Sequence, residues 1–240
     1  MQEMWVYAGA QGMVNATAVP LANGKLLVVD TGGNPADGEF FAQQVAKMGE
    51  VVLVFNTHEH GDHTQGNRFF SCPIISSIPA RQVMAQAPGA DAKSLPHVAF
   101  SDRMELTLGE PLIMQLMGGH CPGLSALYLP ERKLLFTGDL VFNGRMPWMG
   151  QADFHKWINN LDELLSWNAD TVVPGHGPVG GKEILEAQRD FLVNFLQEVK
   201  QAEQHGLDNA AIFTRFLTKN PVQERWQEML RRAIELAIQA

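Results

Sequence analysis

One short segment limits the folds open to this chain more than any other part of it. Residues 56–63 read Asn-Thr-His-Glu-His-Gly-Asp-His and follow directly after the compact apolar run Val51–Phe55. Three imidazoles and the carboxylate of Asp62 therefore lie within six residues, and these nitrogen and oxygen ligands suit zinc or a similar transition metal. We expect a β-strand whose carboxyl end opens directly into a metal-binding loop.

The spacing within this loop divides its side chains between two positions. Residues i and i+2 of an extended segment point the same way, so His58 and His60 can bind one ion. Gly61 lets the chain turn, and Asp62 and His63 can then face a second ion. By chance, the pattern His-x-His-x-Asp-His would occur roughly once in a few thousand chains of this size. A merely solvated polar loop is therefore the weaker interpretation.

The rest of the chain repeats one theme: strands, then a helix, then a strand that ends in a loop containing His. In the first half, apolar runs and turn residues predict the strands Trp5–Ala8, Met13–Val19, Lys25–Val29 and Val51–Phe55, a hairpin turn at Asn23-Gly24 and a helix over Phe40–Met48. In the second half they predict a short helix over Ala80–Gln86, the strands Glu105–Leu108, Leu112–Met117, Ser125–Leu129, Lys133–Thr137 and Thr171–Val173, and a helix from an N-cap at Asp153 to Trp167. This order is typical of an α/β fold.

From about residue 181 the pattern becomes helical. We expect helices over Lys182–His205, Asn209–Leu217 and Pro221–Ile238, with proline suited to a helix start. At 240 residues with 45% hydrophobic composition, one domain over 1–240 is the default, with about 181–240 as its helical C-terminal segment.

Charge and cysteine content exclude several classes of protein. The chain has 26 acidic and 18 basic side chains, a net charge of −8, so nucleic acids and anionic membrane surfaces are disfavoured as partners. We expect no membrane span and two free thiols, Cys72 and Cys121. The first residues do not read as a signal peptide, so the cytoplasm is the expected compartment, or the periplasm if the chain begins at a mature N-terminus.

Three further motifs follow the metal loop in order. They are Gly118-Gly119-His120-Cys121-Pro122-Gly123, Phe136-Thr137-Gly138-Asp139 and Val173-Pro174-Gly175-His176-Gly177. Together with His58–His63 they resemble the signature of the metallo-β-lactamase superfamily. The resemblance covers roughly residues 13–180 and matches the helical tail only loosely.

The resemblance implies a fold, a metal centre and a chemistry. The fold would be the four-layer αβ/βα sandwich with a helical C-terminal extension. One metal would be bound by His58, His60 and His120, a second by Asp62, His63 and His176, and Asp139 would bridge them. Two Zn²⁺ ions per chain are expected, with Fe or Mn as alternatives. Such a pair can lower the pKa of a shared water to near 7, and Asp62 is the expected catalytic acid-base.

Residues around the centre each carry two interpretations. Asp30 either forms a hydrogen bond to a metal ligand or stabilises a turn. Phe142, Arg145 and Trp148 follow Asp139 and either form a substrate wall or pack beneath the next helix. Cys121 is better explained as a small loop residue than as a catalytic thiol. The remaining histidines, His97, His155 and His205, are expected to be ordinary surface or helix residues.

Several functions remain open. The first is a dinuclear zinc hydrolase attacking a small acyl substrate, such as a thioester, lactone, ester or amide. The alternatives are β-lactam hydrolysis by the same site, a mononuclear iron oxygenase like the persulfide dioxygenases, and a non-catalytic metal-binding module. The stretches 138–147 and 170–178 look most like the glyoxalase II-like, sulfur-oxidation-associated and quinoprotein-relay branch. Asn143-Gly144-Arg145 lacks a nearby Tyr, which disfavours glutathione, and the oligomeric state stays open.

Overall fold

The apolar runs pair into two mixed sheets in a computed structural model that describes residues 3–9, 14–21, 24–219 and 222–240. The first sheet contains, in spatial order, β1 (Trp5–Tyr7), β2 (Ala16–Pro20), β3 (Lys25–Val29), β4 (Glu50–Phe55), β5 (Ile74–Ser77) and β6 (Val98–Phe100). The second has the order β11 (Thr171–His176), β10 (Leu134–Phe142), β9 (Ser125–Leu129), β8 (Pro111–Leu116) and β7 (Arg103–Thr107).

Strand direction brings the functional loops to one edge of the sandwich. Strands β3 to β6 run parallel to one another, and β10 pairs with β11 in parallel. The other neighbouring pairs are antiparallel. Because parallel strands end at the same edge of a sheet, the segments after β3 and β4 emerge together. The end of β11 likewise lies beside the end of β10, where Phe142 is in register with His176.

Seven α-helices complete the described chain. They are α1 (Pro35–Met48), α2 (Gly61–Thr64), α3 (Ile78–Gln86), α4 (Phe154–Ser166), α5 (Glu183–Gln204), α6 (Asn209–Lys219) and α7 (Glu224–Gln239), with short 3₁₀ turns at Asn67–Phe69, Ala92–Ser94 and Pro130–Arg132. Asp153 caps α4 by accepting a hydrogen bond from Lys156 N, as its position before an apolar-periodic run predicts. Asn34 caps α1 in the same way.

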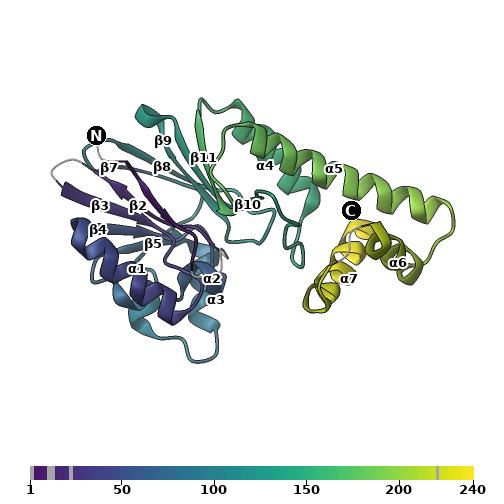
Figure 1. The fold of residues 1–240 in the computed structure, drawn as a ribbon, viewed down its shortest axis with the longest axis horizontal. Coiled ribbons are helices and arrows are strands. Elements are labelled where there is room, and N and C mark those ends of the chain that lie inside the picture. The colour runs from purple at the N-terminus through teal and green to yellow at the C-terminus, as the bar shows by residue number, and fades with distance from the viewer. Residues whose placement is uncertain (1–2, 10–13, 22–23, 220–221) are drawn as a thin grey trace.

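Alternating side chains along the strands build the layers. Leu26 and Val28 of β3 pack on one face with Phe41 and Val45 of α1. Leu27, between them, faces the second sheet and joins the cluster that holds the two sheets together. Each such fully buried side chain stabilises the fold by roughly 1.5–3 kcal/mol. The outer face of the second sheet is covered by a third cluster that includes α4 and α5. The result is the predicted four-layer sandwich of helix, sheet, sheet and helix (Figure 1).

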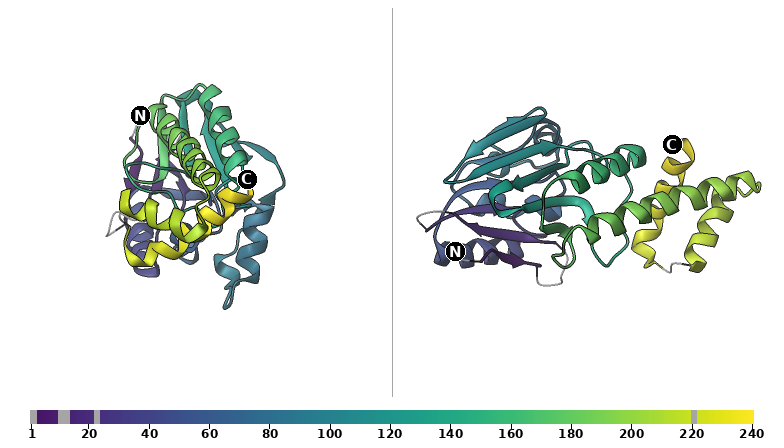
Figure 2. Two further views of the ribbon diagram at one scale, coloured as in Figure 1. Left: turned by 90° about the vertical axis from the view of Figure 1, so that its right-hand side faces the viewer. Right: turned by 90° about the horizontal axis from the view of Figure 1, so that it is seen from above.

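The C-terminal helices extend this sandwich on one side. The 22 residues of α5 begin against the second sheet and continue beyond it, and α6 and α7 fold back along its far end (Figures 1 and 2). Phe195 and Val199 of α5 are buried with Phe216 of α6 and Leu230 of α7. None of the described helices is long and apolar enough to cross a membrane.

Several element boundaries differ from those predicted. Two short strands, β5 and β6, were not predicted, because segments of four and three residues give too little periodicity to detect. Strand β10 continues to Phe142 rather than ending at Thr137, because pairing with β11 carries it past Gly138. Helix α7 begins at Glu224, and the predicted start at Pro221 lies outside the described residues. The same holds for Met13, the predicted start of the second strand, and for Asn23 of the predicted hairpin turn.

Candidate metal centre and active site

Seven predicted ligands converge from four separate segments at the strand-end edge. His58 and His60 lie in the loop after β4, and α2 carries the next two residues of the motif. The loop between β8 and β9, the strand β10 and the end of β11 supply the others. The structure places them in two groups, His58, His60, His120 and Asp139 in one and Asp62, His63 and His176 in the other.

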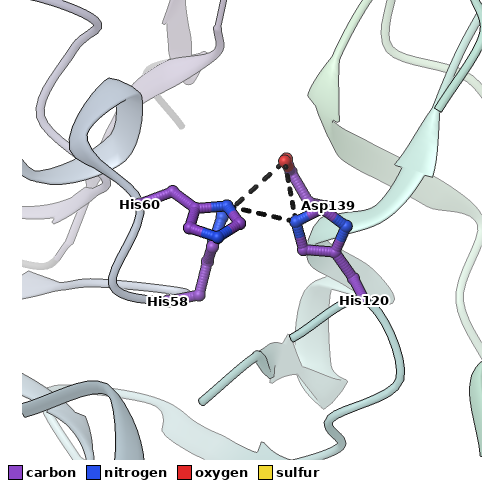
Figure 3. A group of neighbouring side chains, drawn as sticks. All are labelled: His58, His60, His120 and Asp139. Atoms are coloured by element: carbon purple, nitrogen blue, oxygen red, sulfur yellow. Dashed lines mark hydrogen bonds and ion pairs between the residues drawn. The ribbon is translucent and has the colours of Figure 1, made fainter. Parts of the chain in front are cut away.

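Within the first group the ligand atoms point at one another (Figure 3). His60 Nδ1 lies 3.2 Å from His120 Nε2. Asp139 Oδ2 lies 3.7 Å from His58 Nε2 and 3.5 Å from His120 Nε2. Three imidazoles and one carboxylate therefore surround a single point, as a tetrahedral metal site requires.

Asp139 also reaches the second group. Its Oδ1 lies 3.1 Å from His63 Nε2 and 3.2 Å from His176 Nε2. Asp62 Oδ2 completes this group at 3.4 Å from His176 Nε2 and 3.7 Å from His63 Nε2. The carboxylate of Asp139 thus stands between the two groups, where a bridging ligand has to be.

Two glycines let the backbone pack closely enough for Asp139 to lie between the two groups. Gly175 lies against the aspartate, and a Cβ atom at position 175 would overlap Asp139 Oδ1. Gly138, with φ of +48°, adopts a left-handed conformation, and a Cβ there would crowd Thr57. The glycines of the Thr-Gly-Asp and Pro-Gly-His motifs are therefore needed to let β10, β11 and the metal loop approach one another.

The electrostatics of the buried centre suit metal ligands. Burial lowers the pKa of His58 well below its usual value and that of His120 to about 3. Burial opposes the ionisation of Asp139, but His176 and His63 hold its pKa well below the usual value. The centre therefore favours neutral His58 and His120 beside an ionised Asp139, which are the protonation states that bind a metal.

The pKa of His63 shifts in the opposite direction to the pKa of His58 and His120. Burial acts against its charged form, yet Asp139 and Asp30, with a further contribution from Asp62, raise its pKa well above the usual value. Three carboxylates around one imidazole leave an excess of negative charge. A proton on His63 partly offsets this charge, and a bound cation would replace that proton.

The carboxylate of Asp30 is linked by hydrogen bonds to one histidine of each group. Its Oδ1 accepts a hydrogen bond from Thr57 N at 2.8 Å, and its Oδ2 accepts from Thr57 Oγ1 at 2.7 Å and from His63 Nδ1 at 2.8 Å. Thr57 Oγ1 in turn lies 3.0 Å from His58 Nδ1 and can accept its proton. One buried carboxylate thus orients His63 directly and His58 through Thr57, leaving Nε2 of both rings at the centre. These contacts favour the hydrogen-bonding interpretation of Asp30.

Gln151 is a residue of the site that the sequence did not indicate. Its Oε1 lies 3.1 Å from His60 Nε2, so the amide can accept the proton on that nitrogen. This contact leaves His60 Nδ1 free of hydrogen and turned toward His120. Gln151 lies 91 positions away in a loop without a motif, and only the folded chain brings it to His60.

The buried atoms and the donor set of the centre are suited to binding metal ions. His58 Nε2 is a buried atom that forms no hydrogen bond with any described residue. A buried polar atom without a partner costs roughly 1–3 kcal/mol, and a metal ion at this point would remove that cost. The donor set, imidazole nitrogens and carboxylate oxygens, is that of zinc and similar transition metals.

A cavity of about 560 Å³ opens beside the two groups, and His60, Asp62, Asp139 and His176 form its base. The predicted wall residues Phe142, Arg145 and Trp148 all line it, together with Met146. Four further lining residues come from the C-terminal segment and were missed by the sequence analysis: Val222, Gln223, Trp226 and Met229. Trp226 and Met229 lie at the spacing of an ordinary helix face, which gave no sign that they face a site rather than a core.

The remaining singled-out residues lie outside the centre. His97, His155 and His205 are exposed. Cys121 is buried, and burial together with the nearby Glu59 raises the pKa of its thiol well above the usual value. A protonated, buried thiol is a poor nucleophile, in agreement with the interpretation of Cys121 as a loop residue. Neither Cys72 nor Cys121 forms a disulfide.

Known proteins share both sequence and fold with this chain. Metallo-beta-lactamase type 2 of Bacteroides fragilis is 26% identical over 208 residues, covering 83% of this chain and 81% of that protein. Hydroxyacylglutathione hydrolase of Synechococcus sp. (strain JA-2-3B'a(2-13)) is 30% identical over 140 residues, covering 55% of this chain and 51% of that protein. The chain thus matches about half the length of that hydrolase.

Solved structures agree with the fold. The DIM-1 metallo-beta-lactamase exposed to ceftazidime has a TM-score of 0.69 at 22% identity, covering 81% of this chain and 94% of that one. The metallo-beta-lactamase from Pontibacter korlensis has a TM-score of 0.69 at 24% identity, covering 81% and 96%. The sequence profile of the Metallo-beta-lactamase superfamily matches residues 9–71 and 77–176, more than half of the chain. The protein therefore belongs to the metallo-beta-lactamase superfamily and is a metal-dependent hydrolase.

Proposed function

We propose that the protein is a dinuclear zinc hydrolase that attacks a small acyl substrate such as a thioester, lactone, ester or amide. One observation carries this proposal above the others. Two ligand groups of the kind that zinc prefers lie side by side, and Asp139 contacts members of both. Suitable residues stand at all seven ligand positions of the two groups, whereas a purely structural metal site requires only one such group.

His58, His60 and His120 would hold one ion, Asp62, His63 and His176 the other, and Asp139 would bridge them. The ions, when bound, supply a hydroxide at neutral pH and polarise the carbonyl group under attack. Asp30 and Gln151 keep the imidazole rings in the orientation and tautomer that leave the ligand nitrogens free.

Asp62 is the proposed proton carrier. Its side chain is 36% exposed and lines the cavity, whereas that of Asp139 is 3% exposed. A carboxylate in this position can accept a proton from the attacking water and pass it to the leaving group. The apolar walls around Phe142 and Trp148 exclude bulk water from the attacked carbonyl group and so favour these charge interactions.

β-Lactam hydrolysis is the second candidate. It is supported by the match to a metallo-beta-lactamase type 2 over most of this chain. The matches to hydroxyacylglutathione hydrolases support a thioester, although they cover a smaller share of the chain. Both are acyl substrates, and the same set of ligands serves either.

Metal content together with a substrate panel tests the proposal. The purified chain is analysed for zinc, iron and manganese, then assayed on thioesters, lactones and a chromogenic β-lactam. We expect two zinc ions per chain and hydrolysis of at least one class, abolished by a chelator and in His58→Ala but retained in the exposed control His205→Ala. Full activity with a single ion would contradict the dinuclear mechanism. Bound iron with oxygen uptake on persulfides would point to the dioxygenase instead.

A further inference from the structure

The cavity has one wall that the family match does not account for. The superfamily profile ends at residue 176, whereas Val222, Gln223, Trp226 and Met229 of the C-terminal segment line the cavity. They face the same space as the proposed metal ligands His60 and His176. These four residues therefore come from the C-terminal segment and not from the part of the sandwich that the family profile matches.

Helix α7 is held against the site by specific contacts. Met149 N, in the loop beside the cavity, donates a hydrogen bond to Met229 Sδ at 3.3 Å. The guanidinium of Arg231 lies 3.7 Å from the centre of the Phe213 ring and ties α7 to α6. At the end of the chain, the ring Nε2 of His155 in α4 lies 3.0 Å from the oxygen of Ala240. The wall is thus a fixed part of the cavity.

Three of the four side chains of this wall, all except Gln223, are apolar, and the loop after β10 adds further apolar side chains to the same cavity. Trp226 and Met229 come from α7, and Met146 and Trp148 come from the loop after β10. The Trp148 ring lies 5.1 Å from the His60 ring and 5.5 Å from the His120 ring, so the apolar surface begins directly beside the ligands. Aromatic surface of this kind binds flat apolar groups through burial and ring stacking.

The size of the cavity favours a substrate larger than a two-carbon acyl compound. At about 560 Å³ it falls within the range of roughly 300–1,000 Å³ that holds drug-sized ligands. A two-carbon acyl group would leave most of the apolar wall in contact with water. A large apolar group would cover it and gain the free energy of burial.

We propose that the substrate carries a large apolar group, best an aromatic ring, next to the bond that is cleaved, and that Trp226 of α7 determines this specificity. The inference rests on the proposed acyl hydrolase function and narrows its substrate class. The reactive carbonyl group lies at the ligand groups, and the apolar group extends from it toward Trp226 and Met229.

Matched thioesters test this specificity. The zinc-loaded full chain is assayed on the acetyl and phenylacetyl thioesters of one thiol. We expect kcat/KM to be higher for phenylacetyl by about ten-fold or more, and Trp226→Ala to remove that preference mainly through KM. In Trp226→Ala, kcat/KM for the acetyl thioester should fall by much less than kcat/KM for the phenylacetyl thioester. Glu228→Ala, an exposed position on the same helix, is the matched control and should behave as wild type. An equal loss on both thioesters in Trp226→Ala would overturn the inference.

A binding measurement separates this inference from the proposed function. Calorimetry on the zinc-loaded protein compares phenylacetate with acetate and needs no turnover. We expect phenylacetate to bind more tightly by about ten-fold, and this difference to vanish in Trp226→Ala. Equal affinity for the two acids in the wild type would overturn the inference. Tight phenylacetate binding without hydrolysis of any thioester, lactone or β-lactam in the substrate panel would refute the proposed acyl hydrolase function while supporting the apolar ligand class.

A second variant guards against a folding defect. If Trp226→Ala melts well below the wild type, Trp226→Phe replaces it, because a smaller ring keeps part of the packing. An intermediate loss of the phenylacetyl preference is then expected. An undiminished preference in a folded Trp226→Phe variant, with phenylacetate affinity also unchanged, would count against Trp226 as the determinant.

Discussion

Histidine ligands need a fixed tautomer, and in this chain Gln151 and Asp30 provide it. Gln151 accepts from His60 Nε2, and Asp30 accepts from His63 Nδ1. The two rings therefore present different nitrogens, Nδ1 of His60 and Nε2 of His63, to the centre. The spacing of the motif does not reveal this difference, because it depends on acceptors located elsewhere in the chain.

Gln151→Ala should weaken metal binding at the first group. Without the acceptor, His60 can place a proton on Nδ1, and losing a partner of this kind typically costs about 10–100-fold in metal affinity. A competition titration with a chromogenic chelator measures this, with Gln151→Glu expected to retain affinity because it keeps an acceptor. Affinity equal to wild type in Gln151→Ala would show that the contact is incidental.

The pH dependence of metal binding should follow His63. The carboxylates around it raise its pKa above the usual value of 6.5, so the metal-free ring keeps its proton near neutral pH. That proton stabilises the metal-free fold below the usual pKa, and the contribution is lost as the pH rises through the higher folded-state pKa. Metal must displace it, so affinity should rise with pH.

Calorimetry in buffers with different ionisation enthalpies checks this proton release. We expect zinc uptake to release protons at neutral pH and to weaken as the pH falls. Uptake without proton release at neutral pH would mean that His63 is already neutral in the metal-free chain.

At the scale of elements, α4 supports the His120 loop. Asp153 caps the helix through Lys156 N, and its own N–H donates to Gly119 O at 2.8 Å. Trp157, fully buried on this helix, lies 5.3 Å from the His120 ring. The cap that the sequence predicted therefore also helps to hold the His120 loop in position.

Asp153→Ala should destabilise the protein modestly. Loss of an N-cap side chain costs about 1 kcal/mol, which in a chain of this length lowers the melting temperature by about 2–4 °C. Thermal unfolding followed by circular dichroism measures the shift. Glu163→Ala, at an exposed position of the same helix, should melt like the wild type. An equal shift in both variants would show that the effect comes from helix propensity rather than from the cap.

At the scale of the whole molecule, metal binding should stabilise the fold. The centre joins the segment after β4, the β8–β9 loop, β10 and β11, so ions held there connect both sheets. A ligand that binds only the folded state adds about 2.7 kcal/mol at a concentration one hundred times its dissociation constant. Removing metal with a chelator should therefore lower the melting temperature, and zinc should restore it with an end point at two equivalents.

His176→Ala provides the matched comparison, because it removes one ligand of the second group only. Its stabilisation by zinc should reach an end point at fewer equivalents than in the wild type. An unchanged end point would exclude His176 from the ligand set.

The sequence by itself determined the strands with clear alternation, the helix cap at Asp153 and the His58–His63 metal loop, because these depend on local spacing. The resemblance of its motifs to the superfamily implied the remaining candidate ligands. Only the tertiary structure decided which partners meet across long distances. Gln151 reaches His60 and α7 reaches the cavity through contacts that no local pattern encodes. Apolar residues at helical spacing, such as Trp226 and Met229, look the same in a core and in a substrate wall. Their neighbours in space tell the two apart, and those neighbours are set by how the layers pack.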